Sequence, residues 1–129
     1  MLMLMRSDTN TPQSPYLSSN TTGIIVPVIS YTTEEQNFIN TLNKDFQFIF
    51  WYKAWTWDIG IKYLQYFLKE NGYFTETING KNTNATITSL FNRQKDQNII
   101  QLPTDAGAWY LGPTTREIIN PLLKILLNK

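Results

Sequence analysis

The chain has 129 residues, of which 42% are hydrophobic and 14% aromatic, so it can bury one ordinary core but is too short for two full domains. Its net charge of +1 argues against a long electrostatic track for nucleic acid. It contains no cysteine and no histidine, which excludes disulfides, thiolate zinc sites and histidine-dependent nucleophiles. Hydrolysis would then depend on a pair of carboxylates, as in glycosidases.

The N-terminal region (residues 1–31) is predicted to be a polar, extended arm with one short apolar segment. Most of residues 7–23 are Ser, Thr, Asn, Pro and Gly, a composition that buries too little surface to offset chain ordering. Within it, Ile24, Ile25 and Val26 favour extended chain, and the proline that follows excludes a central strand position. The apolar segment either lies on its own domain or docks on a partner.

A helix is expected next, within residues 32–57. Thr32 and Glu35 fit a capping box, in which each side chain satisfies a free backbone amide at the helix start. Apolar residues then recur at helical spacing, which predicts a helix that continues to about residue 55. The competing interpretation is a strand over residues 46–50, where phenylalanines alternate with other residues.

The densest aromatic cluster, formed by Trp51, Tyr52, Trp55 and Trp57, follows in the same region. One interpretation makes it a carbohydrate platform or a surface for docking a partner. The other, which the neighbouring phenylalanines favour, makes it the seam between the N-terminal helix and the rest of the fold.

Three further helices are predicted in residues 58–129. The first is capped by Asp58 and ended by Asn71 and Gly72. The second runs from about residue 85 to 97, after a turn-rich stretch in which Asn79 and a following glycine suit a hairpin turn. The third runs from about residue 113 to 127, and Pro121 should kink or split it.

The segment from Ile61 to Asn120 contains Leu64-Gln65, Gly72-Tyr73, Asn79-Gly80 and Gly112-Pro113. In order and spacing it resembles the small peptidoglycan-binding domain that accompanies many bacterial and phage cell-wall hydrolases. The family pattern joins a helix with Leu-Gln and a Gly-Tyr ending to two loops, each of which opens a further helix at a threonine. The matching residues here are Ile61, Leu64, Gln65, Gly72, Tyr73, Ile78, Asn79, Gly80, Thr86, Ser89, Leu90, Gln94, Gly107, Gly112, Pro113, Thr115 and Ile119. They span nearly half of the chain, and the two loops form a weak internal repeat.

The physical reasons for these matches are local. A threonine at a helix start can cap free amides, and glycine permits a positive φ where the chain reverses. Leu64, Leu68, Leu90 and Ile119 are spaced to meet in one small core. The chain departs from the pattern where Arg93 replaces a core phenylalanine, with Phe91 as the expected substitute, and where the segment 95–110 is longer than usual.

The resemblance implies a mainly α fold, with a three-helix core and short turn or hairpin loops after the extra N-terminal helix and the arm. It also implies non-catalytic binding of bacterial cell-wall peptidoglycan, which presents sugars, amides and carboxylates. Aromatic faces and hydrogen-bond donors would hold such a ligand. The candidate ligand-binding residues are Tyr73, Asn79, Trp109, Tyr110 and Arg116. No catalytic residue, metal or cofactor is expected.

The alternative function is a structural or adaptor protein of a phage virion or another large assembly, which reuses the fold for protein contacts or as an oligomer. A weaker alternative is a small muramidase. The candidate partner-docking residues are Ile24, Ile25, Val26, Trp51, Trp55, Trp57 and Leu126. The sequence predicts neither a membrane span nor a standard signal peptide, and leaves association with a virion or with the cell wall open.

Overall fold

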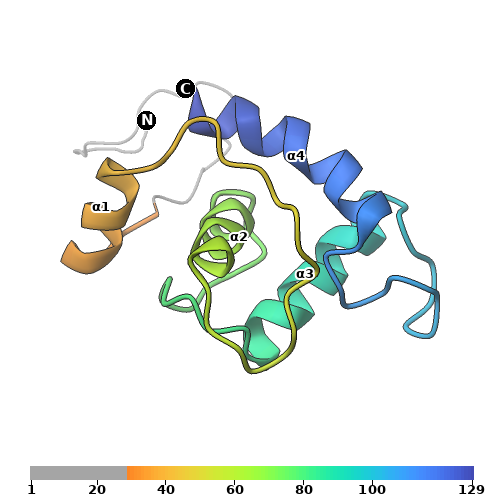
Figure 1. Cartoon of the computed structure of the whole chain (residues 1–129). Coiled ribbons are helices and arrows are strands. Elements are labelled where there is room, and N and C mark those ends of the chain that lie inside the picture. The colour runs from red at the N-terminus through yellow and green to blue at the C-terminus, as the bar shows by residue number, and fades with distance from the viewer. Residues whose placement is uncertain (1–28) are drawn as a thin grey trace, which may run out of the picture. The chain divides into compact units, whose positions relative to one another are not determined.

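The computed structural model describes residues 29–129, and residues 31–129 form one compact unit. The described part contains four helices and no strand, which confirms the mainly α class. They are α1 (Thr33–Asn40), α2 (Ile59–Glu70), α3 (Asn84–Asp96) and α4 (Pro113–Leu127). Figure 1 shows α2 near the centre, with α3 and α4 beside it and the segment between α1 and α2 crossing in front.

α1 starts as predicted but ends much earlier. The Thr32 hydroxyl accepts a hydrogen bond from the Glu35 amide at 3.1 Å, and the Glu35 carboxylate accepts one from the Thr32 amide at 2.8 Å. The capping box is therefore confirmed. The helix stops at Asn40, so the expected continuation to about residue 55 is wrong.

The chain that follows α1 is extended because α4 holds its backbone. The Phe48 amide donates to Asn120 Oδ1 at 2.8 Å, and Asn120 Nδ2 donates to the Phe48 carbonyl at 3.1 Å. Phe48 is buried, Phe46 is half-buried, and Phe50 is exposed. The competing interpretation, a strand over residues 46–50, is wrong as well, because this segment forms no strand and the three phenylalanines do not share one buried face.

The later helices have the predicted ends, to within about two residues. Asp58 caps α2 by accepting a hydrogen bond from the Gly60 amide at 2.7 Å. Gly72 follows α2 with φ of +85°, the left-handed conformation that stops the helix. Pro121 lies inside α4 without splitting it. The expected hairpin at Asn79 does not form, since the one bridge in the described residues joins Trp57, before α2, to Lys81.

One hydrophobic core lies among α2, α3 and α4 and includes all four residues predicted for it. Its buried members are Phe48, Tyr63, Leu64, Tyr66, Phe67, Leu68, Phe74, Ile78, Leu90, Leu111, Ile119, Leu123 and Leu127. Phe91 is not among them, because it packs in a second cluster with Ile100 and Ala108. The guanidinium of Arg93 instead lies 5.4 Å from the centre of the Phe67 ring. The expected substitution of Phe91 for the missing core phenylalanine is therefore wrong.

Two buried glutamines organise the loops between the helices. The Gln65 amide nitrogen donates to Thr86 Oγ1 at 2.9 Å and to the Lys81 carbonyl at 3.0 Å, while its oxygen accepts from the Gly80 amide at 2.9 Å. Both the glutamine and the threonine, which lies 21 residues later, are buried. The glutamine thus supplies donors and acceptors where the loop cannot reach water.

Gln94 repeats this arrangement one helix later. Its amide nitrogen donates to Thr115 Oγ1 at 3.0 Å and to the Tyr110 carbonyl at 2.9 Å, and its oxygen accepts from the Trp109 amide at 3.0 Å. The threonine again lies 21 residues after the glutamine. The internal repeat is therefore structural, but neither Thr86 nor Thr115 caps its helix as expected, since each hydroxyl accepts from its glutamine.

Glu35 ties α1 to the rest of the unit. Its carboxylate, only 2% exposed, accepts hydrogen bonds from the Ile78 amide at 2.7 Å and from Lys69 Nζ at 3.2 Å. Burial by itself raises the pKa of Glu35, but the amides of Ile78 and Thr32 together with Lys69 outweigh it. The pKa therefore lies below its usual value.

Candidate functional site

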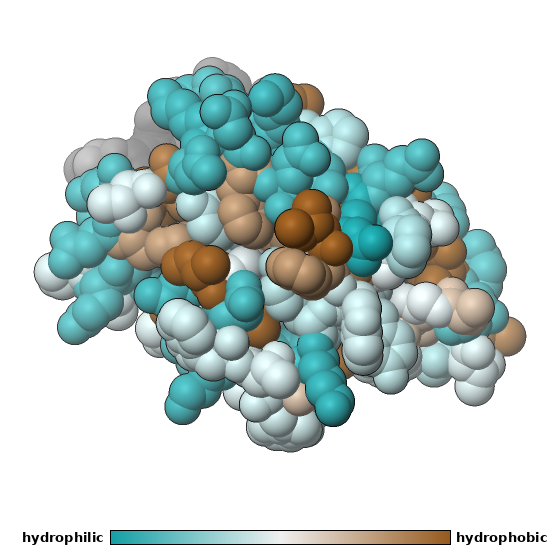
Figure 2. All heavy atoms as spheres, in the orientation of Figure 1, coloured by the Kyte–Doolittle hydropathy of each residue, from teal (hydrophilic) through white to brown (hydrophobic). Residues whose placement is uncertain are grey.

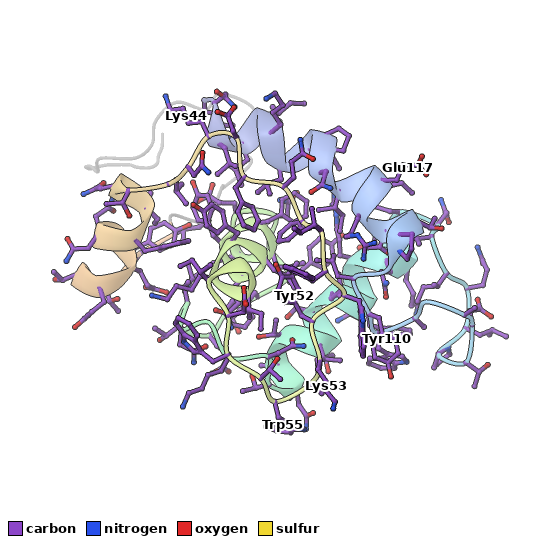
Figure 3. The ribbon with its side chains drawn as sticks, viewed as in Figure 1. Lys44, Tyr52, Lys53, Trp55, Tyr110 and Glu117 are labelled. Atoms are coloured by element: carbon purple, nitrogen blue, oxygen red, sulfur yellow. The ribbon has the colours of Figure 1, made fainter. Side chains whose placement is uncertain are left out.

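The most exposed aromatic residues lie on one loop, residues 49–57, which we call the aromatic loop. Trp51 is 51% exposed and Trp55 69% exposed, and Trp57 is exposed as well. Figure 3 shows the loop passing in front of α3, with Trp55 at its lower end. The interpretation of these tryptophans as a buried seam is therefore wrong.

Asn82 holds the aromatic loop in place. Its side-chain amide donates to the carbonyls of Tyr52 and Lys53, both at 3.2 Å. Its backbone carbonyl accepts from the Trp55 amide at 2.8 Å, and its backbone amide donates to the Thr56 carbonyl at 2.9 Å. The loop thus carries its aromatic side chains on a backbone fixed by hydrogen bonds.

Trp51 and Tyr110 meet edge to face at one end of the aromatic loop. Their ring centres are 5.6 Å apart, and Tyr110 is 49% exposed. Arg116 Nη1 donates to the carbonyl of Leu111, the residue after Tyr110, at 2.8 Å, so the half-buried Arg116 side chain is anchored on the chain next to Tyr110. We call the two exposed rings together with Arg116 the Trp51–Arg116 site.

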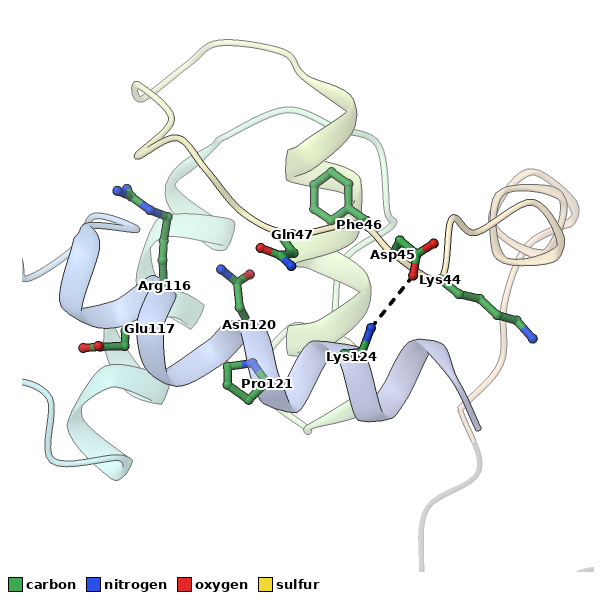
Figure 4. A pocket seen from close by; sticks show the side chains of 9 residues that line it. All are labelled: Lys44, Asp45, Phe46, Gln47, Arg116, Glu117, Asn120, Pro121 and Lys124. Atoms are coloured by element: carbon green, nitrogen blue, oxygen red, sulfur yellow. Dashed lines mark ion pairs between the residues drawn. The ribbon is translucent and has the colours of Figure 1, made fainter.

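A polar groove of about 330 Å³ adjoins this site along α4. Figure 4 shows its lining, which comprises Lys44, Asp45, Phe46, Gln47, Arg116, Glu117, Asn120, Pro121 and Lys124. Lys124 lies 3.9 Å from Asp45, and both side chains are largely exposed, so water weakens this ion pair. The groove offers amide, carboxylate and cationic groups to a polar ligand.

Tyr52 belongs to the aromatic loop, but its side chain packs against the core instead of facing the solvent. Burial, together with the nearby Asp58 carboxylate, raises the pKa of its hydroxyl to about 12, although Arg116 partly opposes the rise. The ring is packed against the hydrophobic core. Tyr52 therefore supports the loop as a neutral side chain.

Three predicted ligand-binding residues are engaged within the fold instead. The Tyr73 hydroxyl donates to Asp96, and the Asn79 side-chain oxygen accepts from Gln65 at 3.1 Å and from the Lys81 amide at 2.9 Å. Trp109 stacks on Phe91 with ring centres 3.9 Å apart. Of the other two predicted residues, Tyr110 is exposed and pairs with Trp51, and Arg116 is half-buried and lines the groove.

Some of the predicted partner-docking residues are exposed, and others are engaged within the fold. Trp51 joins Tyr110, while Trp57 donates its indole N–H to the Asn79 carbonyl at 3.1 Å. Leu126 is half-buried against the core. Ile24, Ile25 and Val26 lie outside the described residues.

Gln47 and Asn120 line the groove but were not predicted. No local motif marks either residue, because the contact between Phe48 and Asn120 joins positions 72 residues apart. A second cavity of about 270 Å³ lies at the start of α4, lined by Ile99, Ala106, Gly107, Gly112, Pro113, Thr114 and Thr115. It lacks charged side chains.

Within residues 29–129, no three acidic side chains come together as a metal site would require. No helix in the same part of the chain is both long and apolar enough to cross a membrane. Comparisons with protein-family models, with curated proteins and with solved structures found no match to this chain. The resemblance to the peptidoglycan-binding domain therefore rests on the motif residues alone.

Proposed function

We propose that this chain binds bacterial cell-wall peptidoglycan without cleaving it, and that the Trp51–Arg116 site makes the contact. The observation that carries the proposal is the exposed pair of Trp51 and Tyr110 rings, together with Arg116, which is anchored on the carbonyl of the residue after Tyr110 and lines the polar groove. Peptidoglycan is the proposed ligand because the motif residues between Ile61 and Asn120 resemble those of the peptidoglycan-binding domain.

The chemistry of this site matches the chemistry of the proposed ligand. The apolar faces of sugar rings pack on aromatic side chains, and a guanidinium binds a carboxylate through paired hydrogen bonds. Gln47 and Asn120 add amide groups in the groove, where peptide amides need partners. A polymer with alternating sugars and short peptides can use all three kinds of group.

Co-sedimentation with purified peptidoglycan sacculi tests the proposal. We expect the unaltered protein to pellet, and Trp51→Ala or Tyr110→Ala to lower the affinity about tenfold, which corresponds to ~1.4 kcal/mol. Leu102→Ala is the matched control, because Leu102 is also an exposed apolar residue but lies outside this site. An unaltered protein that stays in the supernatant would contradict wall binding.

A turbidity assay on the same sacculi tests the proposed lack of catalysis. We expect no clearing of the walls. Clearing that a single Glu→Gln substitution abolishes would show a muramidase instead.

A second function, contact with a protein in a large assembly, is favoured by one observation. Ile49 and Phe50 are exposed beside Trp51, and a sugar ligand has little use for an aliphatic side chain. Size-exclusion chromatography with light scattering distinguishes the two. A stable oligomer that Phe50→Ser dissociates, without any binding to sacculi, would favour the assembly role.

A further inference from the structure

Backbone conformation singles out a few side chains in the described part of the chain. Four non-glycine residues there have positive φ: Tyr52 at 44°, Trp55 at 66°, Asn98 at 58° and Trp109 at 74°. This conformation brings Cβ too close to the following carbonyl, and asparagine tolerates it better than bulky residues. The three aromatic residues therefore require a compensating interaction.

Two of the three have that interaction inside the fold. The Tyr52 ring packs on the core, and its hydroxyl fills the space beside Gly60, where an added Cβ would lie 1.8 Å from it. Trp109 stacks on Phe91 and donates its indole N–H to the Pro103 carbonyl at 2.8 Å. These side-chain contacts offset the strain of the positive φ at Tyr52 and Trp109.

The Trp55 side chain makes no such contact with the described residues, 29–129. Its side chain is 69% exposed, it pairs with no aromatic ring, and its indole N–H donates to no described residue. Asn82 nevertheless holds the backbone there, because it binds the chain at Tyr52, Lys53, Trp55 and Thr56. The fold thus fixes a strained residue whose side chain gains little from the fold.

We infer that Trp55 is the residue on which a saccharide ring of the wall glycan stacks, an inference that rests on the proposed function. The indole offers a flat face to the sugar C–H groups and a free N–H to a hydroxyl. Figure 3 places Trp55 beside Lys53, and Figure 2 shows the brown patches of this face nearer the middle, away from this lower end. Lys53 and Thr56, on either side of Trp55 in the loop, are both exposed. Polar neighbours of this kind suit a sugar better than an apolar protein face.

Asn82 is the corresponding positioning residue. It binds the backbone of the aromatic loop, so it presents the indole to the ligand without an ordering cost at the moment of binding. Asn82→Ala should therefore weaken binding while Trp55 remains in the chain.

Glycine substitutions separate the roles of the two strained tryptophans. Trp55→Gly removes the backbone strain and the side chain together, so we expect an unfolding temperature at or above that of the unaltered protein, with binding to sacculi weakened about tenfold. Trp109→Gly is the matched control, because it relieves the same kind of strain but loses the stack on Phe91. We expect it to lower the unfolding temperature by about 5 °C or more.

The outcomes are distinct. If the unaltered protein pellets with sacculi and Trp55→Gly pellets equally well, the saccharide role of Trp55 is overturned while wall binding stands. If Trp55→Gly unfolds at a clearly lower temperature, the side chain is held by the fold and the inference also fails. If the unaltered protein does not pellet, both the proposed function and this inference are overturned.

Discussion

The side-chain amide of Gln65 donates to the hydroxyl of Thr86 at 2.9 Å inside the core, 21 residues away along the chain. Gln94 and Thr115 make the same contact at 3.0 Å over the same separation. Each pair fastens the start of one helix to the preceding helix. The same glutamines also bind backbone groups of the loops between these helices.

Replacing either buried glutamine should destabilise the fold strongly. Gln65→Ala would leave the backbone amides of Asn79 and Gly80 without their acceptor and remove the donor to the buried Thr86 hydroxyl, and we expect a loss of about 3 to 5 kcal/mol in the free energy of unfolding. Urea unfolding followed by circular dichroism measures it. Gln36→Ala, at an exposed glutamine of α1, is the control and should change stability by less than about 0.5 kcal/mol.

A near-isosteric change tests the direction of these hydrogen bonds. Gln94→Glu should be at least as damaging at neutral pH as Gln94→Ala, because the new oxygen would face the carbonyls of Gly107 and Tyr110. A glutamate variant with unchanged stability would show that this donor arrangement is wrong.

The extended segment before α2 can be tested with two phenylalanines. Phe48→Ala removes a buried ring, and we expect a loss of about 3 to 5 kcal/mol. Phe50→Ala, two residues later and exposed, should cost less than about 0.5 kcal/mol. Equal losses at the two positions would contradict the burial of Phe48 and the exposure of Phe50.

Glu35 should make stability depend on pH in the acid range. Its pKa is lower in the folded protein than the usual value near 4.5, so its stabilisation is complete above about pH 4.5 and is lost as the pH falls through the folded pKa. Urea unfolding at pH 7 and at about pH 3 measures the change. Glu35→Gln should reduce the difference between the two, whereas Glu34→Gln, on the exposed side of α1, should leave it unchanged.

The space beside Gly60 allows a direct packing test. A Cβ at this position would lie 1.8 Å from the Tyr52 hydroxyl, so Gly60→Ala should destabilise by about 1 to 3 kcal/mol. Combining it with Tyr52→Phe should recover part of the loss, because the closest atom is then absent. Purely additive effects of the two substitutions would show that the residues do not interact.

The sequence by itself determined the local features of this protein. The capping box at Thr32, the cap at Asp58 and the left-handed Gly72 each depend on residues within three positions of one another, so they could be predicted and are confirmed. The apolar spacing also placed Leu64 and Ile119 in the same core. Local backbone chemistry and helical periodicity are sufficient for features of this range.

Only the tertiary structure decided the features that depend on distant partners. Phe48 is extended because Asn120 binds its backbone, and the tryptophans that follow are exposed because Asn82 holds their loop against the start of α3. Neither contact leaves a local pattern, so helical spacing predicted a helix and the aromatic cluster suggested a seam. The candidate site follows from these two asparagines, because they decide which aromatic side chains reach the solvent.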